Sequence, residues 1–161
     1  MSVYVSVAPP DGFHRWSDAD WERWLKDHPW EAAERVCSRG DWAIFLYQVR
    51  MHAPKGKISI EPILEQLVNE RPLTAQDAED FRLALDLARD ALDKKPSAEM
   101  KSGNNNFASP EDLEEMLAAA RTRLGGRDPS MGDVWAEVFD QIGKVLDNAV
   151  EQRRGIYFGN V

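Results

Sequence analysis

Residues 130–161 read SMGDVWAEVFDQIGKVLDNAVEQRRGIYFGNV. At about 100° per residue, the apolar side chains of a helix through this stretch fall within an arc of roughly 160°. These side chains are Val134, Trp135, Val138, Phe139, Ile142, Val145, Leu146, Ala149 and Val150. An arc this wide predicts that most other elements pack against the helix, with Trp135 and Ile142 in the core.

The two ends of this predicted helix also have recognisable signals. Ser130 and Asp133 have the spacing of an N-terminal capping box. Arg153-Arg154-Gly155 predicts a basic last turn with a glycine stop, and residues 156–158 predict a short strand.

The beginning of the chain predicts a strand and a short helix. Residues 3–7 alternate and are rich in valine, which predicts a strand. Ser17 and Asp20 predict a second capping box, which opens a helix that Pro29 ends. Because the two terminal segments are both predicted strands, they are expected to pair in one small sheet.

Two further helices are expected before residue 53. One short helix is predicted from about Trp30 to Ser38, with Gly40 as its stop. The apolar residues of 42–49 have helical spacing and predict the next helix. Residues 44–47 also fit a buried strand, because a short apolar run cannot be assigned by periodicity alone.

The second half of the chain predicts three helices before the terminal one. Pro62 suits the first turn of the first helix, and Thr74 caps the next, from Ala75 to about Asp93. Residues 94–108 form the only long loop, which we expect to be mobile. A helix capped by Ser109 follows and ends at Gly125-Gly126. The sequence therefore predicts a mainly helical α+β fold with one domain over 1–161.

Composition narrows the class of protein. A single cysteine excludes an internal disulfide framework, and no apolar run reaches the roughly twenty residues that span a bilayer. The N-terminus lacks the basic and apolar regions of a secretion signal. We therefore expect a cytoplasmic protein that does not bind membranes.

The charge is strongly acidic, with a net charge of −8. Such a chain repels nucleic acid unless it carries a local basic patch, and only pairs of basic residues occur. The segment from Glu61 to Asp93 contains nine acidic residues and only three basic ones. This segment is interpreted either as a solvated surface or as a docking face for a basic partner.

Two groups of residues are candidates for partner binding. On the predicted helix from Ala75 to Asp93, two leucines lie off the apolar stripe and beside acidic residues; the group is Glu79, Leu83, Asp86, Leu87 and Asp90. Trp21 and Trp24, on the first helix, belong to a cluster of four tryptophans in fifteen residues. Packing against the sheet and the terminal helix is the favoured interpretation of that cluster, and an exposed aromatic patch is the alternative.

Catalytic signals are weak throughout. The histidines and the cysteine lack metal-binding spacing, and no phosphate loop, dinucleotide fingerprint or nucleophile elbow occurs. Neither a cofactor nor a metal is therefore predicted. Cys37 is interpreted as a buried, inert thiol. An enzyme or small-ligand site assembled only in the fold stays open as an alternative, with His14, Cys37 and His52 as its candidates.

The order of elements resembles the YfbM-like family of small bacterial proteins of unknown function. The resemblance rests on the opening strand with the Ser17-Asp-Ala-Asp-Trp helix, on Pro72-Leu-Thr-Ala-Gln-Asp77 entering a long amphipathic helix, and on the terminal helix and strand. The usual glycine-rich stretch of the family is replaced here by 50–57. The resemblance implies an α+β fold and supplies no catalytic residues.

The leading hypothesis is a non-enzymatic protein-binding domain. Its most concrete form is an immunity or antitoxin-type inhibitor that covers a basic partner protein, because small acidic inhibitors gain association rate from charge and affinity from buried aromatic residues. The alternatives are the small-ligand protein or enzyme described above and an adaptor without an inhibitory role.

Overall fold

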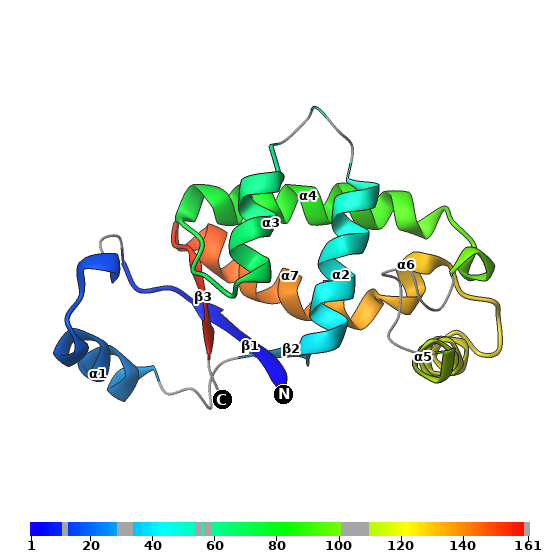
Figure 1. Ribbon diagram of the computed structural model, residues 1–161, viewed down its shortest axis with the longest axis horizontal. Coiled ribbons are helices and arrows are strands. Elements are labelled where there is room, and N and C mark those ends of the chain that lie inside the picture. The colour runs from blue at the N-terminus through cyan, green and yellow to red at the C-terminus, as the bar shows by residue number, and fades with distance from the viewer. Residues whose placement is uncertain (11–12, 29–33, 54–55, 57–58, 101–109, 160–161) are drawn as a thin grey trace.

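The computed structural model describes residues 1–10, 13–28, 34–53, 56, 59–100 and 110–159, apart from the side chains of His14 and Pro110. It confirms a mainly helical α+β fold (Figure 1). The described elements are, in order, β1 (Ser2–Val7), η1 (Phe13–Arg15), α1 (Asp18–Asp27), β2 (Glu34–Ser38), α2 (Arg39–His52), α3 (Glu61–Val68), α4 (Ala75–Asp93), η3 (Ser97–Glu99), α5 (Pro110–Arg123), α6 (Met131–Val134), α7 (Ala136–Glu151) and β3 (Ile156–Gly159).

The core lies where α4, α7 and α2 meet. Helices α4 and α7 run side by side and α2 crosses them (Figure 1). Trp135 and Ile142 are fully buried, which confirms both predictions. The Phe45 ring of α2 lies 5.7 Å from the Trp135 ring and 4.9 Å from the Phe139 ring, centre to centre. Tilted and edge-to-face aromatic contacts therefore join α2 to the C-terminal helix.

The C-terminal helix is interrupted, whereas the sequence predicted one continuous helix. The capping box of Ser130 and Asp133 is present, but it caps the four-residue α6. Trp135, with φ −95° and ψ 5°, separates α6 from α7. In a continuous helix the Asp133 carbonyl would accept from residue 137. It accepts instead from the Trp135 N–H and, at 2.9 Å, from the guanidinium of Arg123 on α5.

The sheet has three antiparallel strands in the order β2-β1-β3. Pairing of Val5 with Phe158 confirms the predicted pairing of the terminal strands. The helix predicted over 30–38 is wrong at 34–38, which form β2, and 30–33 lie outside the described residues. Val36 and Cys37 are buried, and Cys37 pairs with Val3. Pairing with a strand more than thirty residues upstream overrides the local helical pattern.

Helix α2 confirms the helical interpretation of 42–49 and not the strand alternative. Its N-cap is Ser38, whose hydroxyl accepts from the Asp41 N–H at 3.1 Å. Gly40 therefore lies in the first turn of α2 and does not stop a preceding helix.

The predicted mobile loop differs from the structure in its first part. Residues 97–99 form the short helix η3, and the Ser97 N–H donates to the Pro129 carbonyl at 3.1 Å. Ser97 and Met100 are both buried. This part of the loop is packed on the domain, and residues 101–108 lie outside the described ones.

Helix α7 ends differently from the predicted glycine stop. The residue with a left-handed conformation is Arg153, with φ 54°, and the Arg154 N–H donates to the Ala149 carbonyl at 2.8 Å. Gly155 is buried, and a Cβ built on it would clash with the carbonyl of Leu73. Gly155 is therefore needed for close approach of two backbones. At the end of α5, by contrast, Gly125 and Gly126 have φ of 66° and 91°, as the predicted stop requires.

Candidate functional site

The outward side of α4 carries an exposed leucine among acidic side chains. We call this surface the α4 face; its residues are Glu79, Leu83, Asp86, Leu87 and Asp90. At about 100° per residue, all of these residues except Leu87 fall within an arc of roughly 60° around the helix. The Leu83 side chain is 51% exposed, the three acids are exposed, and Leu87 is half-buried. The sequence-predicted residues of α4 therefore share one surface.

The opposite side of α4 explains why this surface faces outward. Phe81, Leu85 and Ala88 are buried at the centre of the domain, where α4 contacts α2 and α7. Burial of these side chains fixes the rotation of the helix, because turning it would expose them to water. Leu83 is then held on the solvent side by the packing of its own helix.

The acids of the α4 face differ in their partners. The Asp86 carboxylate lies 2.7 Å from the Arg82 guanidinium, one turn earlier on the same helix. Among the described residues, Glu79 and Asp90 form no ion pair. These two carboxylates are therefore the ones that are open to a partner's cations.

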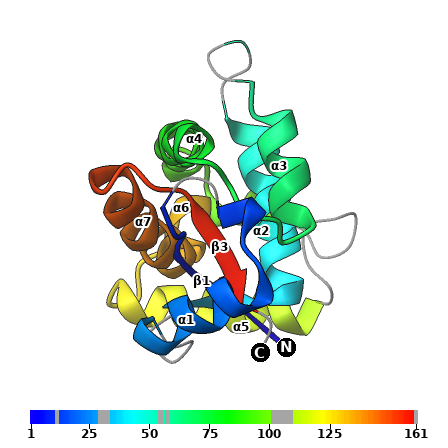
Figure 2. The ribbon, with the colours of Figure 1, turned by 90° about the vertical axis from the view of Figure 1, so that its left-hand side faces the viewer.

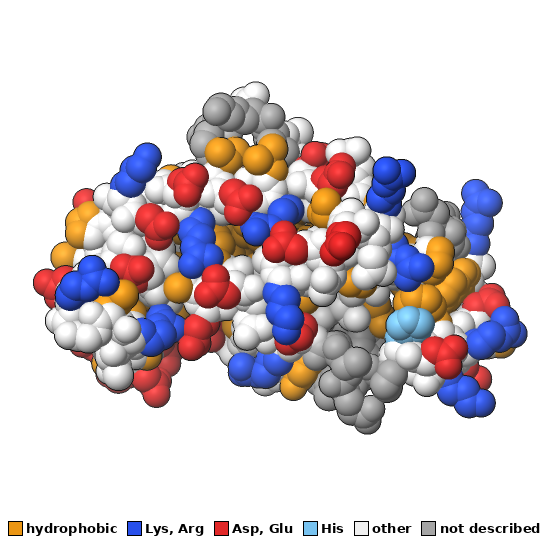
Figure 3. All heavy atoms as spheres, turned by 180° about the vertical axis from the view of Figure 1, so that it is seen from behind, with side chains coloured by type: hydrophobic (Ala, Val, Ile, Leu, Met, Phe, Trp, Pro, Cys, Tyr) orange, Lys and Arg blue, Asp and Glu red, His pale blue; other side chains and the backbone are white. Residues whose placement is uncertain are grey.

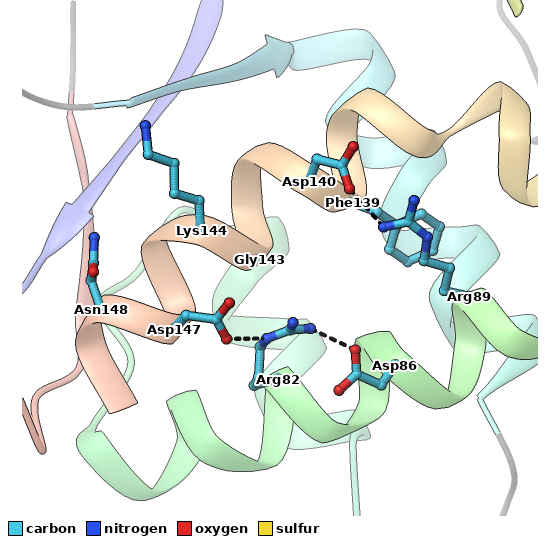
Figure 4. Close-up of a pocket in the computed structure, with 9 residues that line it drawn as sticks. All are labelled: Arg82, Asp86, Arg89, Phe139, Asp140, Gly143, Lys144, Asp147 and Asn148. Atoms are coloured by element: carbon cyan, nitrogen blue, oxygen red, sulfur yellow. Dashed lines mark hydrogen bonds and ion pairs between the residues drawn. The ribbon is translucent and has the colours of Figure 1, made fainter. Parts of the chain in front are cut away.

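Helices α4 and α7 are joined along a shallow cavity of about 340 Å³. Arg82 also contacts Asp147 at 2.7 Å, and Arg89 contacts Asp140 at 2.8 Å (Figure 4). Burial lowers the pKa of Arg82, but hydrogen bonds and charge from Asp147 and Asp86 outweigh it and raise that pKa.

The cations of this cavity already have carboxylate partners. Lys144 pairs with Glu34 of β2 at 2.7 Å, and the Arg89 guanidinium also lies over the Phe139 ring, 5.4 Å from its centre. Figure 3 shows acidic and basic side chains interspersed over the face seen from behind. The cavity is therefore a structural junction, and its paired cations leave little charge to hold an anion.

The tryptophans of α1 lie in an aromatic cluster at the end of the sheet. Trp21 lies 5.3 Å from Trp16 and 5.8 Å from Tyr157 of β3, between ring centres. The Arg154 guanidinium lies 5.7 Å from the ring centre of Trp24. Trp21 and Trp24 are half-buried, and no residue of α1 is fully buried.

These tryptophans do not join the α4 face. Helices α1 and α4 lie apart in both Figure 1 and Figure 2. The cluster packs on β3 and on Arg154, which precedes it. Packing against the sheet agrees with the favoured interpretation of these tryptophans. The two groups of candidate residues therefore belong to two separate surfaces.

The candidate catalytic residues are not brought together. Ser38 separates Cys37 from the first residue of α2, and His52 is the last residue of that helix, so about 20 Å of helix lies between Cys37 and His52. Burial and the charge of Asp41 raise the pKa of Cys37 to about 12. Burial and the charge of Lys95 lower the pKa of His52. The side chain of His14 lies outside the described part of the chain.

Other known kinds of site are not found in the part of the chain that the structure describes. No group of three His, Cys, Asp or Glu side chains is placed to hold a metal ion. No helix there is long and apolar enough to cross a membrane.

Comparison of the chain with protein-family models, with curated proteins and with solved structures finds no match. Function is therefore inferred from the chemistry of the surfaces themselves.

Proposed function

We propose that the protein binds a basic protein partner through the α4 face, in the manner of an immunity or antitoxin-type inhibitor. The observation that carries the proposal is Leu83, a half-exposed leucine held between acidic side chains on a rigid helix. An apolar anchor beside unpaired carboxylates is the pattern that binds a lysine- or arginine-rich surface with its own apolar centre.

The acids and the leucine have different roles in this proposal. The net charge of −8 and the unpaired Glu79 and Asp90 accelerate the encounter with a basic surface, and salt weakens that effect. Burial of Leu83 at the interface then slows dissociation. The long helix α4 supplies a rigid support, so little conformational freedom is lost on binding.

The test uses two variants of the α4 face and one matched control. Leu83→Gln removes the anchor, and Glu79→Gln with Asp90→Asn removes two charges that form no ion pair with any described residue. The control, Glu114→Gln with Glu115→Gln, changes the net charge equally on exposed residues of α5. Circular dichroism checks that all variants keep the helical fold.

The immobilised proteins are exposed to an extract of the cells that produce the chain, and captured proteins are identified by mass spectrometry. We expect a basic protein that wild type and control retain equally. Leu83→Gln should weaken its binding about tenfold, mainly through a faster off-rate. The charge variant should slow association about tenfold at low salt and much less at high salt.

Equal capture by all four proteins, with the same salt dependence, would show that the α4 face is only a solvated surface. The inhibitory form has its own readout, because the captured partner should lose its activity when wild type is added. Full activity within the complex would contradict inhibition and favour an adaptor.

A further inference from the structure

A second, apolar surface lies between α2 and α3, away from the α4 face. It is a groove of about 630 Å³. Leu46 and Leu64, both buried, form its floor, and Ala43, Tyr47 and Val68 line it. Because α2 and α3 contact the core through their other sides, this seam is open to solvent.

The walls of the groove expose large apolar side chains. Val68 is 59% exposed. An adjoining hollow of about 290 Å³ shares Tyr47 and Arg50 with the groove and extends it to Met51, which is 57% exposed. A pocket for a small ligand usually encloses most of the ligand's surface, whereas these apolar side chains are largely exposed to solvent. A protein partner with an apolar surface of its own would cover more of them than a small ligand would.

The length of the groove fits a helix. Its α2 wall extends from Ala43 to Arg50 and its α3 wall from Glu61 to Asn69. At about 1.5 Å per residue these walls are roughly 10–12 Å long, which is two helical turns. An amphipathic helix spans this length with apolar residues at i, i+4 and i+7.

The charges at the rim of the groove favour one side of a bound helix facing α3. Arg50 and Glu61 pair with each other at 3.0 Å at one end of the groove. Glu65 is exposed on the α3 wall and forms no ion pair among the described residues. A cation on the flank of the helix that faces α3 therefore finds an unpaired carboxylate.

The geometry points to a binding groove for an amphipathic helix of a partner protein, with apolar residues at i, i+4 and i+7 and a lysine or arginine on the side facing α3. This inference goes beyond the proposed function, because it uses no residue of the α4 face. It assigns a helix-in-groove mode to this part of the surface.

The probe is a displayed library of random 14-residue peptides, selected on wild type alone and then tested on the variant Ala43→Arg. Ala43 is exposed on α2, so arginine is compatible with the helix and fills the groove. Val68→Gln is a second variant that removes an exposed wall without touching the floor. Ala119→Arg is the matched control, because it places the same arginine at an exposed alanine of another helix, α5.

Enriched peptides should share the i, i+4, i+7 apolar pattern with a flanking cation. Fluorescence anisotropy of a labelled peptide should show binding at least about tenfold weaker to Ala43→Arg and to Val68→Gln, and unchanged binding to Ala119→Arg. Glu65→Gln should weaken binding less and reduce its salt dependence.

Three results would overturn the inference. One is enrichment on wild type that neither groove variant reduces, or no enrichment at all. Another is a dimer of wild type that Ala43→Arg dissociates in analytical ultracentrifugation, since a second copy would then occupy the groove. The third is selected peptides without helical spacing. Failure of the α4-face variants in the capture experiment leaves these results unaffected, because the two surfaces share no residue.

Discussion

Replacing Gly155 by alanine tests whether this glycine serves close packing and not chain reversal. A Cβ at this position meets the Leu73 carbonyl, which is backbone and cannot rotate away. The Leu73 carbonyl accepts from the Ile156 N–H at 3.2 Å, and the Leu73 N–H donates to the Ile156 carbonyl at 2.9 Å. Alanine must push these two backbones apart, so both hydrogen bonds are strained together.

The cost follows from these contacts. Two hydrogen bonds contribute about 0.5–1.5 kcal/mol each, and overpacking at a tight contact adds about 1–3 kcal/mol. Gly155→Ala should therefore lower the free energy of unfolding by about 2–6 kcal/mol. In a chain of 161 residues, where each kcal/mol shifts Tm by about 2–4 °C, this loss corresponds to a fall in Tm of about 4–24 °C.

Gly126 provides the matched control, because its φ is 91° and a Cβ there meets open space. Gly126→Ala should cost only about 1–2 kcal/mol from the left-handed backbone, and asparagine should cost less than alanine there. At Gly155 the order should reverse, since asparagine is larger. Urea unfolding of the four variants measures this. Should Gly155→Ala prove no more destabilising than Gly126→Ala, the packing role assigned to Gly155 is wrong.

Three further outcomes are expected. Trp135→Ala should lower the free energy of unfolding by about 3–5 kcal/mol, and an unchanged thermal melt would contradict the burial of this ring. With its pKa near 12, Cys37 holds only about one thiolate in 10⁵ molecules at pH 7, so a mild alkylating reagent should label native protein far more slowly than urea-unfolded protein. Burial and the carboxylates of Asp133 and Asp90 raise the pKa of Asp93 against the opposing charge of Arg89. When folding raises the pKa of a carboxyl group, the ionised group destabilises the fold at pH values above the folded-state pKa. This destabilisation is absent below the pKa of the unfolded state. Asp93→Asn should therefore raise the Tm at pH 7 and lose this advantage by about pH 3. Solvent screening at this exposed residue keeps the gain below about 1 kcal/mol, and an equal gain at both pH values would rule out the electrostatic cause.

The fold was predictable where local signals repeat. Helix α4 begins after its Thr74 cap and ends at Asp93, as its apolar stripe predicted. Strand β2 was not predictable in the same way, because its five residues contain too few periods to separate strand from helix. Its conformation depends on Val3 and its neighbours in β1, and that partner is known only once the chain has folded.

The sequence could predict only those parts of the candidate site that lie on a single helix. Helical phase placed Leu83 off the apolar stripe and beside Glu79 and Asp90, and the structure shows that this side of α4 is exposed. The groove between α2 and α3 has no such signal. Val68 directly follows the buried Leu67 and continues the apolar pattern of its own helix, so the pattern alone does not distinguish it from a core residue. Its exposure depends on where α2 lies.

The pairing of Asp86 changes which acids matter most on the α4 face. A partner's lysine that approaches Asp86 must compete with Arg82, which already lies 2.7 Å from that carboxylate. The competition exchanges one ion pair for another and gains little free energy. Glu79 and Asp90 have no such partner in the part of the chain that the structure describes, so a cation that reaches them forms a new pair. Arg82 meanwhile stays bound to Asp147 of α7, and the junction between the two helices persists when Asp86 turns toward a partner. In the proposed complex, the steering charge of the α4 face therefore resides in Glu79 and Asp90, with Leu83 between them as the anchor.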